Sequence, residues 1–379
     1  MNIGIVGAGI GGLSAAIALQ KRGHEVQLFE QASQIKALGA GLVLAANAIY
    51  ALSLLGLDKK VEQIGQWIGG ADVLDHEGKV LMGTDFKGHK DQRIGQNFSV
   101  HRAELHAILR GELKPETLRL GQQCVRFSQH DKTIEVVLAS GERQIFDVLV
   151  AADGLHSPLR QQVWPSTTLR FAGYTSWRGV ISQKRLSEPI IGFSESWGVG
   201  RRFGLVPLSQ DRLYWFACKN AMPHDPQMEV MTPDGLLSLF RDFHAPIPEV
   251  LQNTQQEEVH WADIYDVKPL QKFYHKRLIL LGDAAHGTTP NMGQGACMAI
   301  EDALVLAKVL DDESHLENAL QQYQQKRWAR VQKVVKTSRQ IGAVAHKCPE
   351  NFVPLRNALL RKMPASEKQL RWLFSTNWY

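Results

Sequence analysis

A cluster of glycines directly after a short apolar run is the feature that most restricts the fold of this chain. Residues 3–6 read as a short strand, residues 7–12 (GAGIGG) satisfy G-x-G-x-x-G, and residues 13–22 have the mixed faces of a helix. A second strand over 24–30 alternates polar and apolar side chains and ends in Glu30. This order is that of a parallel βαβ unit.

Each glycine of the turn has a physical task in binding a dinucleotide. Gly7 permits the tight turn, Gly9 lets the backbone approach a pyrophosphate, and Gly12 allows the helix to pack closely on the strand. The helix N-terminus offers free N–H groups and the positive end of its dipole to the phosphates. Glu30, near the usual offset of about 20 residues, would accept hydrogen bonds from ribose hydroxyls. We therefore predict a dinucleotide site, with an empty glycine-rich turn as the alternative; the motif does not separate NAD from FAD.

Composition favours a cytoplasmic globular enzyme. The chain has 379 residues, of which 44% are hydrophobic and 21% charged, and this length predicts two to three domains or one domain with a large insertion. The net charge of +5 is spread along the chain, so nucleic-acid binding is not expected. The four cysteines have no metal-ligand spacing, which predicts reduced thiols and no metal site. We expect neither a secretory signal nor a spanning helix.

Further apolar runs predict the rest of an α/β fold. Residues 148–152 and 278–281 read as buried strands of the same sheet, with polar residues at their carboxyl ends, where such sheets bind ligands. Residues 171–270 are aromatic-rich and predict a mixed, largely antiparallel sheet, which a hairpin over 71–96 would join. Helices are expected over 296–310 and 316–341. The predicted domains are listed by range: a discontinuous nucleotide-binding domain at 1–70, 97–170 and 271–345, a substrate-binding domain at 71–96 and 171–270, and a helical tail at 346–379.

Three motifs together resemble the single-component FAD-dependent aromatic hydroxylases of the para-hydroxybenzoate hydroxylase fold. They are the opening glycine motif with Glu30, D-G-x-x-S-x-x-R at 153–160, and Gly-Asp at 282–283 followed by Pro290 and Gly-Gln-Gly at 293–295. The resemblance implies an α/β fold: a Rossmann-like FAD-binding domain of the GR2 type, an inserted mixed β-sheet substrate domain, and C-terminal helices. Within the family the chain is similar to the branch of flavin-dependent urate hydroxylases and related monooxygenases.

The resemblance also implies which residues bind FAD. Asp283 and Arg102 would contact its ribityl and phosphate region, while Asp153 and Arg160 would brace that region near the path of the nicotinamide cofactor. As alternatives, Asp283 would be a helix N-cap, Arg102 a surface residue and Arg160 a structural ion-pair partner. The implied set is Gly7, Gly9, Ile10, Gly11, Gly12, Glu30, Gln31, Gly41, Arg102, Val125, Asp153, Arg160, Asp283, Pro290, Gly293, Gln294 and Gly295.

Residue chemistry agrees with a flat ring near the last motif. The glycines at 293 and 295 let backbone N–H groups lie against such a ring, and the helix that follows points its positive N-terminus at the same place. Pro290 offers an apolar wall without an N–H group. A reduced flavin carries negative charge, which this arrangement would stabilise.

The implied reaction is hydroxylation of a small aromatic or heteroaromatic substrate. In this family NADH or NADPH reduces FAD, and O2 then forms a flavin C4a-hydroperoxide that delivers the oxygen. Arg202 and Tyr214 are the candidate catalytic residues: Arg202 would hold an anionic or carbonyl group, and Tyr214 would donate a hydrogen bond. The alternatives are a solvated arginine and a core aromatic residue. The chain has one dinucleotide fingerprint, so the nicotinamide cofactor would bind transiently.

Asn291 departs from the urate hydroxylases, which have an aspartate at this position. An amide does not act as the general base that deprotonates a ring N–H. The sequence therefore disfavours urate and favours a phenol, a hydroxyquinoline or the epoxidation of an alkene.

Other classes of function stay open at this point. One is an FAD-dependent reductase or dehydrogenase of the same fold that acts on a lipid or polyene, and another is a flavin-binding module without catalysis. The aromatic density around residues 171–216 favours the hydroxylase. We expect a monomer or homodimer whose partner is a small aromatic substrate.

Overall fold

The opening segment forms the predicted parallel βαβ unit. In a computed structural model, which describes residues 1–35, 40–86, 95–362, 367–375 and 377–379, β1 (Asn2–Val6) leads through the glycine turn into α1 (Ile10–Lys21). The chain then returns as β2 (Glu25–Glu30), which pairs with β1 in parallel. The apolar residues of β1 and α1 are almost entirely buried, which explains why a short apolar run and an alanine-rich helix fold together here.

Both later apolar runs are strands of the same six-stranded sheet, as predicted. The strand order is β18-β19-β12-β1-β2-β8. β12 (Val148–Ala151) pairs in parallel with β1, and β19 (Leu278–Leu280) pairs in parallel with β12. Because parallel strands end at one edge, the residues that follow β1, β12 and β19 lie close together there. The outer strands are β8 (Leu118–Leu120) and β18 (Tyr274–His275).

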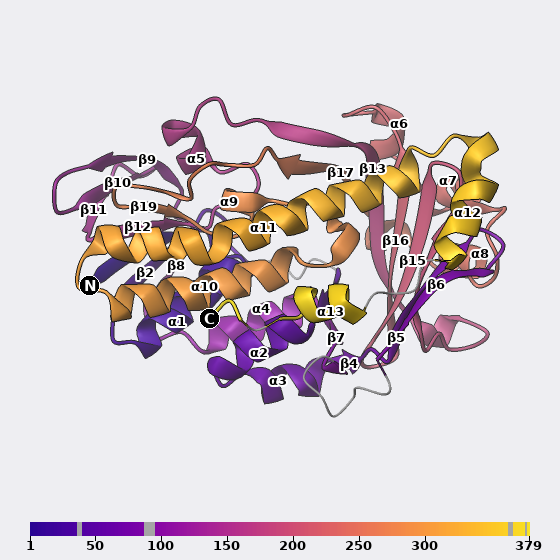
Figure 1. Cartoon of the computed structure of the whole chain (residues 1–379), viewed down its shortest axis with the longest axis horizontal. Coiled ribbons are helices and arrows are strands. Elements are labelled where there is room, and N and C mark those ends of the chain that lie inside the picture. The colour runs from indigo at the N-terminus through magenta and orange to yellow at the C-terminus, as the bar shows by residue number, and fades with distance from the viewer. Residues whose placement is uncertain (36–39, 87–94, 363–366, 376) are drawn as a thin grey trace.

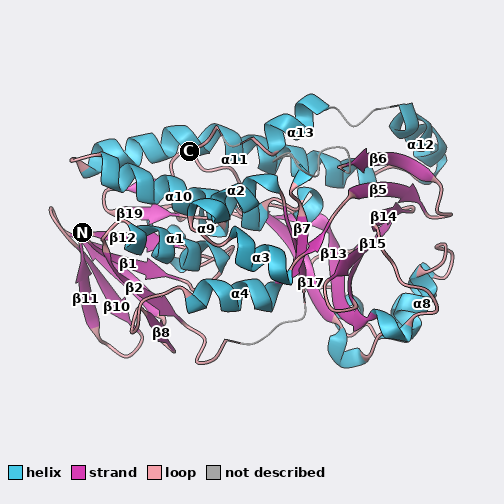
Figure 2. Ribbon diagram, turned by 90° about the horizontal axis from the view of Figure 1, so that it is seen from below, coloured by secondary structure: helices cyan, strands magenta, loops and turns pink. Residues whose placement is uncertain are grey.

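Two long helices lie across this sheet and connect it to a second sheet (Figure 1). α10 (Gly295–Asp312) packs against α1, and α11 (Leu316–His346) packs against α10. α11 continues past α9 (Asp283–His286) to the second sheet, where its end contacts β13 and β15. Figure 2 shows the two sheets at opposite ends of the molecule, with α3 and α4 between them in this view.

The second sheet is mixed and largely antiparallel, as predicted. Its seven strands have the order β17-β13-β16-β15-β14-β5-β6, and the β14–β5 pair alone is parallel among the pairs described. The predicted hairpin joins it as β5 and β6; residues 87–94 of the predicted 71–96 segment lie outside the described residues. The strands are β5 (Gly70–Asp75), β6 (Val80–Asp85), β13 (Leu169–Ser182), β14 (Phe193–Trp197), β15 (Arg201–Leu208), β16 (Arg212–Asn220) and β17 (His260–Val267).

The two faces of the second sheet have different surroundings. One face carries Trp177, Phe203 and Trp215, which form a core with α7 (Pro233–Phe240) and α8 (Ile247–Gln252). Side chains alternate between the faces of a strand, so the neighbours of these residues point the other way. On that side the ring of Tyr214 lies against Gly41, which begins β3 (Gly41–Leu44). The second face therefore looks toward the nucleotide-binding region.

Shorter elements complete the chain. β3 and β4 (Gln66–Trp67) both pair with β7 (Phe98–His101). The remaining strands and helices are β9 (Cys124–Gln129), β10 (Ile134–Leu138), β11 (Arg143–Phe146), α2 (Ala46–Leu54), α3 (Asp58–Ile64), α4 (Arg102–Gly111), α5 (Pro158–Val163), α6 (Pro226–Glu229), α12 (Val353–Lys362) and α13 (Glu367–Leu373). None of the helices built from the described residues is long and apolar enough to cross a bilayer.

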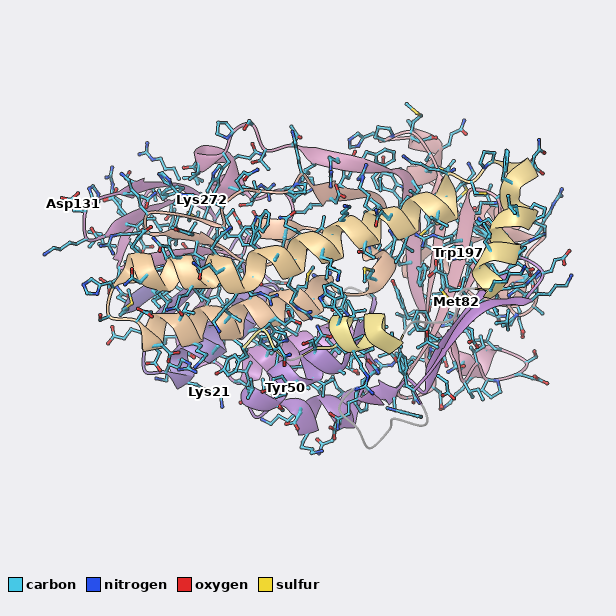
Figure 3. All side chains as sticks on the ribbon, viewed as in Figure 1. Lys21, Tyr50, Met82, Asp131, Trp197 and Lys272 are labelled. Carbon is cyan, nitrogen blue, oxygen red and sulfur yellow. The ribbon has the colours of Figure 1, made fainter. Side chains whose placement is uncertain are left out.

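The C-terminal tail first covers the second sheet and then returns to the first. α12 packs on β6, near Trp197 and Met82 (Figure 3). Further on, the ring of Trp378 meets Tyr50 of α2 with centroids 6.0 Å apart, and the hydroxyl of Tyr379 accepts a hydrogen bond from Arg22. The tail therefore connects elements from both ends of the molecule.

Candidate active site

The glycine turn has the geometry of a pyrophosphate cradle. Gly7 has φ +100°, and a Cβ atom there would lie 2.3 Å from the carbonyl oxygen of Ala152. A Cβ on Gly12 would lie 1.9 Å from the carbonyl oxygen of Gly7, whereas a Cβ on Gly9 would meet nothing within 4 Å. The first turn of α1 contains no acidic residue and no side-chain cap. Its N–H groups are thus free to bind an anion in the open space beside Gly9.

Glu30 lies beside this turn. Its two carboxylate oxygens accept hydrogen bonds from the backbone N–H groups of Ala8 and Ala32, each at 2.9 Å. The next residue, Gln31, is exposed, and Val125 on β9 is 43% exposed. The predicted contacts of these three residues with the adenosine of FAD stay predictions.

Asp283 and Arg102 approach the same place from distant parts of the chain. Asp283 begins α9 after β19, and its side chain is exposed to solvent although protein surrounds it closely. Burial among these neighbours raises the pKa of Asp283, and the charges of His286 and Arg102 oppose the shift. A Cβ on Gly295 would lie 3.9 Å from Oδ1 of Asp283, so the carboxylate is next to the start of α10.

The last motif forms an open surface around the N-terminus of α10. Gly293 has φ +63° and lies against Val43 of β3, and Pro290 is exposed. α10 has no side-chain cap and no acidic residue in its first turn. Backbone N–H groups, a positive helix end and the nearby Asp283 therefore lie together, which fits the FAD that the sequence implies.

Arg160 contacts the segment next to Asp283, and Asp153 lies in the same motif as Arg160. Oδ2 of Asp153 accepts a long hydrogen bond of 3.4 Å from the N–H of Leu159, and its buried Oδ1 has no hydrogen-bond partner among the described residues. Arg160 has no exposed surface and donates to the carbonyl oxygens of Ala284 (2.9 Å) and Leu155 (2.6 Å). Arg160 thus joins two motifs through backbone carbonyls. Its predicted contact with the nicotinamide cofactor, and the alternative of a structural ion pair, stay predictions.

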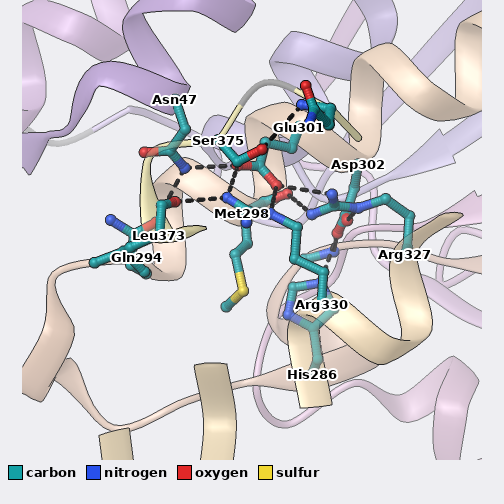
Figure 4. A network of polar contacts seen from close by, with 12 residues as sticks. Asn47, His286, Gln294, Met298, Glu301, Asp302, Arg327, Arg330, Leu373 and Ser375 are labelled. Carbon is teal, nitrogen blue, oxygen red and sulfur yellow. Dashed lines mark hydrogen bonds and ion pairs between the residues drawn. The ribbon is translucent and has the colours of Figure 1, made fainter. Parts of the chain in front are cut away.

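A buried charge network anchors the last two motifs (Figure 4). Oδ2 of Asp302 accepts a hydrogen bond from the N–H of Gly282 (3.0 Å) and contacts His286 Nε2 (2.6 Å), and its Oδ1 accepts from Arg327 (2.6 Å). Burial alone would raise the pKa of Asp302, but His286 and Arg327 lower it well below the usual range. The carboxylate therefore fixes the turn that carries Asp283.

The second acid of the network, Glu301, is connected to Gln294 of the Gly-Gln-Gly motif through Asn47. Asn47 is not among the site residues that the sequence predicts. Glu301 is paired with Arg330 (2.7 Å) and accepts a hydrogen bond from Asn47 Nδ2 (2.6 Å). The same amide nitrogen donates to Gln294 Oε1 at 3.0 Å. No local pattern distinguishes Asn47, because its partners come from other helices. It fixes the side chain of Gln294 at the start of α10.

Arg202 is engaged by protein groups on every side. Its side chain is 2% exposed, with Nη1 bonded to Glu195 (2.7 Å), Nη2 to Asn291 Oδ1 (2.7 Å) and Nε to His346 Nε2 (2.8 Å). Its guanidinium also lies 5.3 Å from the centroid of the Tyr174 ring. These contacts favour a role in organising the face of the second sheet. The sequence predicts that Arg202 contacts the substrate. Each nitrogen of its guanidinium already donates to a protein group, and the contact with substrate stays a prediction.

Tyr214 is half-buried on the same face. A Cβ on Gly41 would lie 2.5 Å from its ring, and the ring of Phe216 is 6.1 Å away. Burial raises the pKa of Tyr214, and the nearby charge of Arg178 opposes this shift. The phenol is therefore neutral at neutral pH, and its role as a hydrogen-bond donor to substrate stays a prediction.

We expect His346 to make the stability of the folded protein sensitive to acid. The ring stacks on Tyr174 at 4.1 Å, and burial, together with the charge of Arg202, lowers the pKa of His346 to about 2. Below about pH 6.5 the unfolded chain binds a proton at this residue that the folded chain does not. The free energy of unfolding should therefore fall with decreasing pH, at up to about 1.4 kcal/mol per unit from this residue.

Denaturant unfolding of the wild type and of His346→Gln at pH 6 and pH 4 checks this prediction. Glutamine keeps an acceptor for Arg202 but does not titrate. The wild type should lose more stability than the variant over this interval. Equal losses would show that His346 titrates normally in the folded protein.

Comparisons with known proteins agree with this geometry. Residues 1–338 match the family described as FAD binding domain. Over 98% of its length the chain is 36% identical to aurachin C monooxygenase/isomerase of Stigmatella aurantiaca, covering 96% of that protein. It is 34% identical to 2-heptyl-3-hydroxy-4(1H)-quinolone synthase of Pseudomonas aeruginosa, with the same coverage of each. The structure of Klebsiella pneumoniae HpxO complexed with FAD and uric acid superposes with a TM-score of 0.88, at 27% identity, over 99% of this chain and 96% of that one.

The motifs, their positions at one edge of the first sheet and the family match over most of the length point to one class. The turn after β1, the acids after β12 and β19, and the start of α10 are neighbours in the structure, and their contacts with FAD stay predictions. The chain therefore belongs to the FAD-binding-domain family of FAD-dependent aromatic hydroxylases.

Proposed function

We propose that this monooxygenase hydroxylates the heteroaromatic ring of a 2-alkyl-4(1H)-quinolone or a close analogue. The observation that carries the proposal is the 34% identity, over almost the whole of both chains, to an enzyme named for its 2-heptyl-3-hydroxy-4(1H)-quinolone product. A monooxygenase that yields a 3-hydroxy quinolone inserts oxygen at C3 of the ring.

The state of Asn291 supports a substrate that needs no general base. Its Oδ1 accepts from Arg202 (2.7 Å) and Tyr174 (3.0 Å), and its Nδ2 donates to Thr289 (3.0 Å) and to the carbonyl of Ser338 (2.8 Å). The amide is fully used within the protein and does not remove a proton from a ring. C3 of a 4-quinolone is already nucleophilic, because the ring nitrogen donates electron density to it through the conjugated system.

The acid beside Arg202 comes from another strand. Glu195 of β14 balances the guanidinium charge, and position 291 contributes a neutral amide. A carboxylate at 291 would add a second negative charge next to one arginine. This charge distribution supports a substrate other than urate.

The chain's residues have distinct tasks in the proposed reaction. Bound FAD would take two electrons from NADH or NADPH and activate O2, so that one oxygen atom enters the ring and the other leaves as water. The turn at 7–12 would hold the pyrophosphate, and Asp283 with the start of α10 would hold the ribityl and ring end. The aromatic face around Tyr214 and Phe216 would hold a flat apolar ring and exclude water from it.

Oxygen uptake and product analysis test the proposal. The purified protein, loaded with FAD, is mixed with NADH or NADPH in air, with 2-heptyl-4(1H)-quinolone, urate, a simple phenol or no addition. We expect the quinolone to stimulate oxygen uptake and to gain one oxygen atom. Stimulation by urate instead would contradict the proposal. Oxidation of the nicotinamide cofactor at the same rate without O2 would indicate a reductase.

A further inference from the structure

The face of the second sheet that looks toward the FAD region carries two arginines. Arg202 on β15 is directly opposite Cys218 of β16, and Arg178 on β13 is directly opposite Phe216 of β16. Residues that are paired across antiparallel strands share a face, and so do residues two apart on a strand. Arg178 and Arg202 therefore lie on the same face as Tyr214.

The two arginines differ in what neutralises them. Arg202 is 2% exposed and has an ion pair with Glu195. Arg178 is partly buried, and no hydrogen bond or ion pair joins it to any of the described residues. Partial burial of a cation costs free energy when no acceptor or opposite charge replaces the lost water, and a bound ligand would provide such a partner.

Arg178 is also close to the phenol of Tyr214. Val180, two residues further along β13, pairs directly with Tyr214. The charge of Arg178 acts on both Tyr214 and Cys218, opposing the rise that burial gives to the pKa of each. A guanidinium whose N–H donors have no partner among the described residues thus borders the same part of the face as a phenol O–H.

We infer that Arg178 and Tyr214 form a subsite for an oxygen atom that is attached to the substrate's ring, such as the 4-oxygen of a quinolone. The inference rests on the proposed function for the identity of the ring. A guanidinium beside that oxygen holds it by a charged hydrogen bond, and the phenol O–H of Tyr214 gives a second one, so that the ring is fixed in one orientation on the sheet face. Arg202 holds the sheet face together, and Arg178 makes the contact with substrate.

Ligand affinity in matched variants tests this subsite. Calorimetry on the FAD-loaded protein measures Kd for 2-heptyl-4(1H)-quinolone, for salicylate as a second ring that carries an oxygen atom and an ionised carboxylate, and for 2-heptylquinoline, whose ring carries no oxygen. The variants are Arg178→Met, Arg178→Lys and, as a control on the exposed side of α4, Arg110→Met. Arg178→Met should raise the Kd of the oxygen-bearing ligands by about 10- to 100-fold, as expected for the loss of a charged hydrogen bond.

The remaining variants and ligands distinguish a failure of the Arg178 subsite from a failure of the proposed function. Arg178→Met should change the Kd of 2-heptylquinoline less than about threefold, Arg178→Lys should recover part of the loss, and Arg110→Met should match the wild type. The subsite is refuted if Arg178→Met binds both oxygen-bearing rings as the wild type does, or if the wild type prefers neither of them to 2-heptylquinoline. Arg178-dependent binding of salicylate alone, or of a quinolone that gains no oxygen, would retain the subsite and remove the proposed substrate.

Discussion

Gly12→Ala should give a protein that retains no FAD and is less stable by more than about 3 kcal/mol, if it folds at all. The methyl group would lie 1.9 Å from the carbonyl oxygen of Gly7, and neither backbone segment has room to move, because Gly7 is itself packed against Ala152. Separation of α1 from β1 would relieve the clash and destroy the turn that binds the pyrophosphate. Flavin absorbance after purification and denaturant unfolding measure the two effects.

Gly9→Ala is the matched control for this experiment. Gly9 has φ −70°, which any residue adopts, and its added methyl group would meet no protein atom within 4 Å. The stability of the FAD-free protein should therefore stay within about 1 kcal/mol of the wild type, while the affinity for FAD falls because the methyl occupies the anion site. Full FAD content in Gly12→Ala, or wild-type FAD affinity in Gly9→Ala, would contradict the assignment of this turn.

Arg327→Met should lower the free energy of unfolding by about 3–5 kcal/mol. Arg327 has no exposed surface and pairs with Asp302 (2.6 Å) and Glu301 (2.7 Å), which are equally buried. Methionine fills a similar volume but removes the positive charge that neutralises the buried carboxylates of Asp302 and Glu301. Because Asp302 also holds Gly282 and Glu301 holds Asn47, we expect weaker FAD binding as well.

The same substitution in a surface pair provides the comparison. Arg143 is 60% exposed and pairs with Glu135 at 3.1 Å, so Arg143→Met should cost about 0–1 kcal/mol. Denaturant unfolding of both variants at neutral pH measures the difference. If Arg327→Met were as stable as Arg143→Met, the buried network would not anchor the site.

The sequence predicted the parts of the fold that local patterns specify. The run at 148–152 is continuously apolar because β12 is buried on both faces, and the glycines at 7 and 12 are required by contacts within a single βαβ unit. The start of α10 was predicted for the same reason, since glycine, proline and an apolar period mark it locally.

What could not be predicted depends on register and long-range packing. The sequence contains Arg178 and Arg202 in similar aromatic segments, and the choice between them depends on Glu195, which reaches Arg202 only through the pairing of β14 with β15. His346 joins the same site from the far end of α11. Asn47 gives no signal at all, because its partners lie on α10. Residue type does not distinguish the two: Arg202 is paired with Glu195, whereas Arg178 has no ion pair among the described residues.

Oxidation of 2-heptyl-4(1H)-quinolone under isotopically labelled O2 tests the central claim most directly. The FAD-loaded protein and NADH or NADPH should give a product that carries one labelled oxygen atom on the ring, with none from water. A product whose new oxygen atom is unlabelled, and so comes from water, would contradict the account, as would consumption of the nicotinamide cofactor that leaves every aromatic ring unchanged.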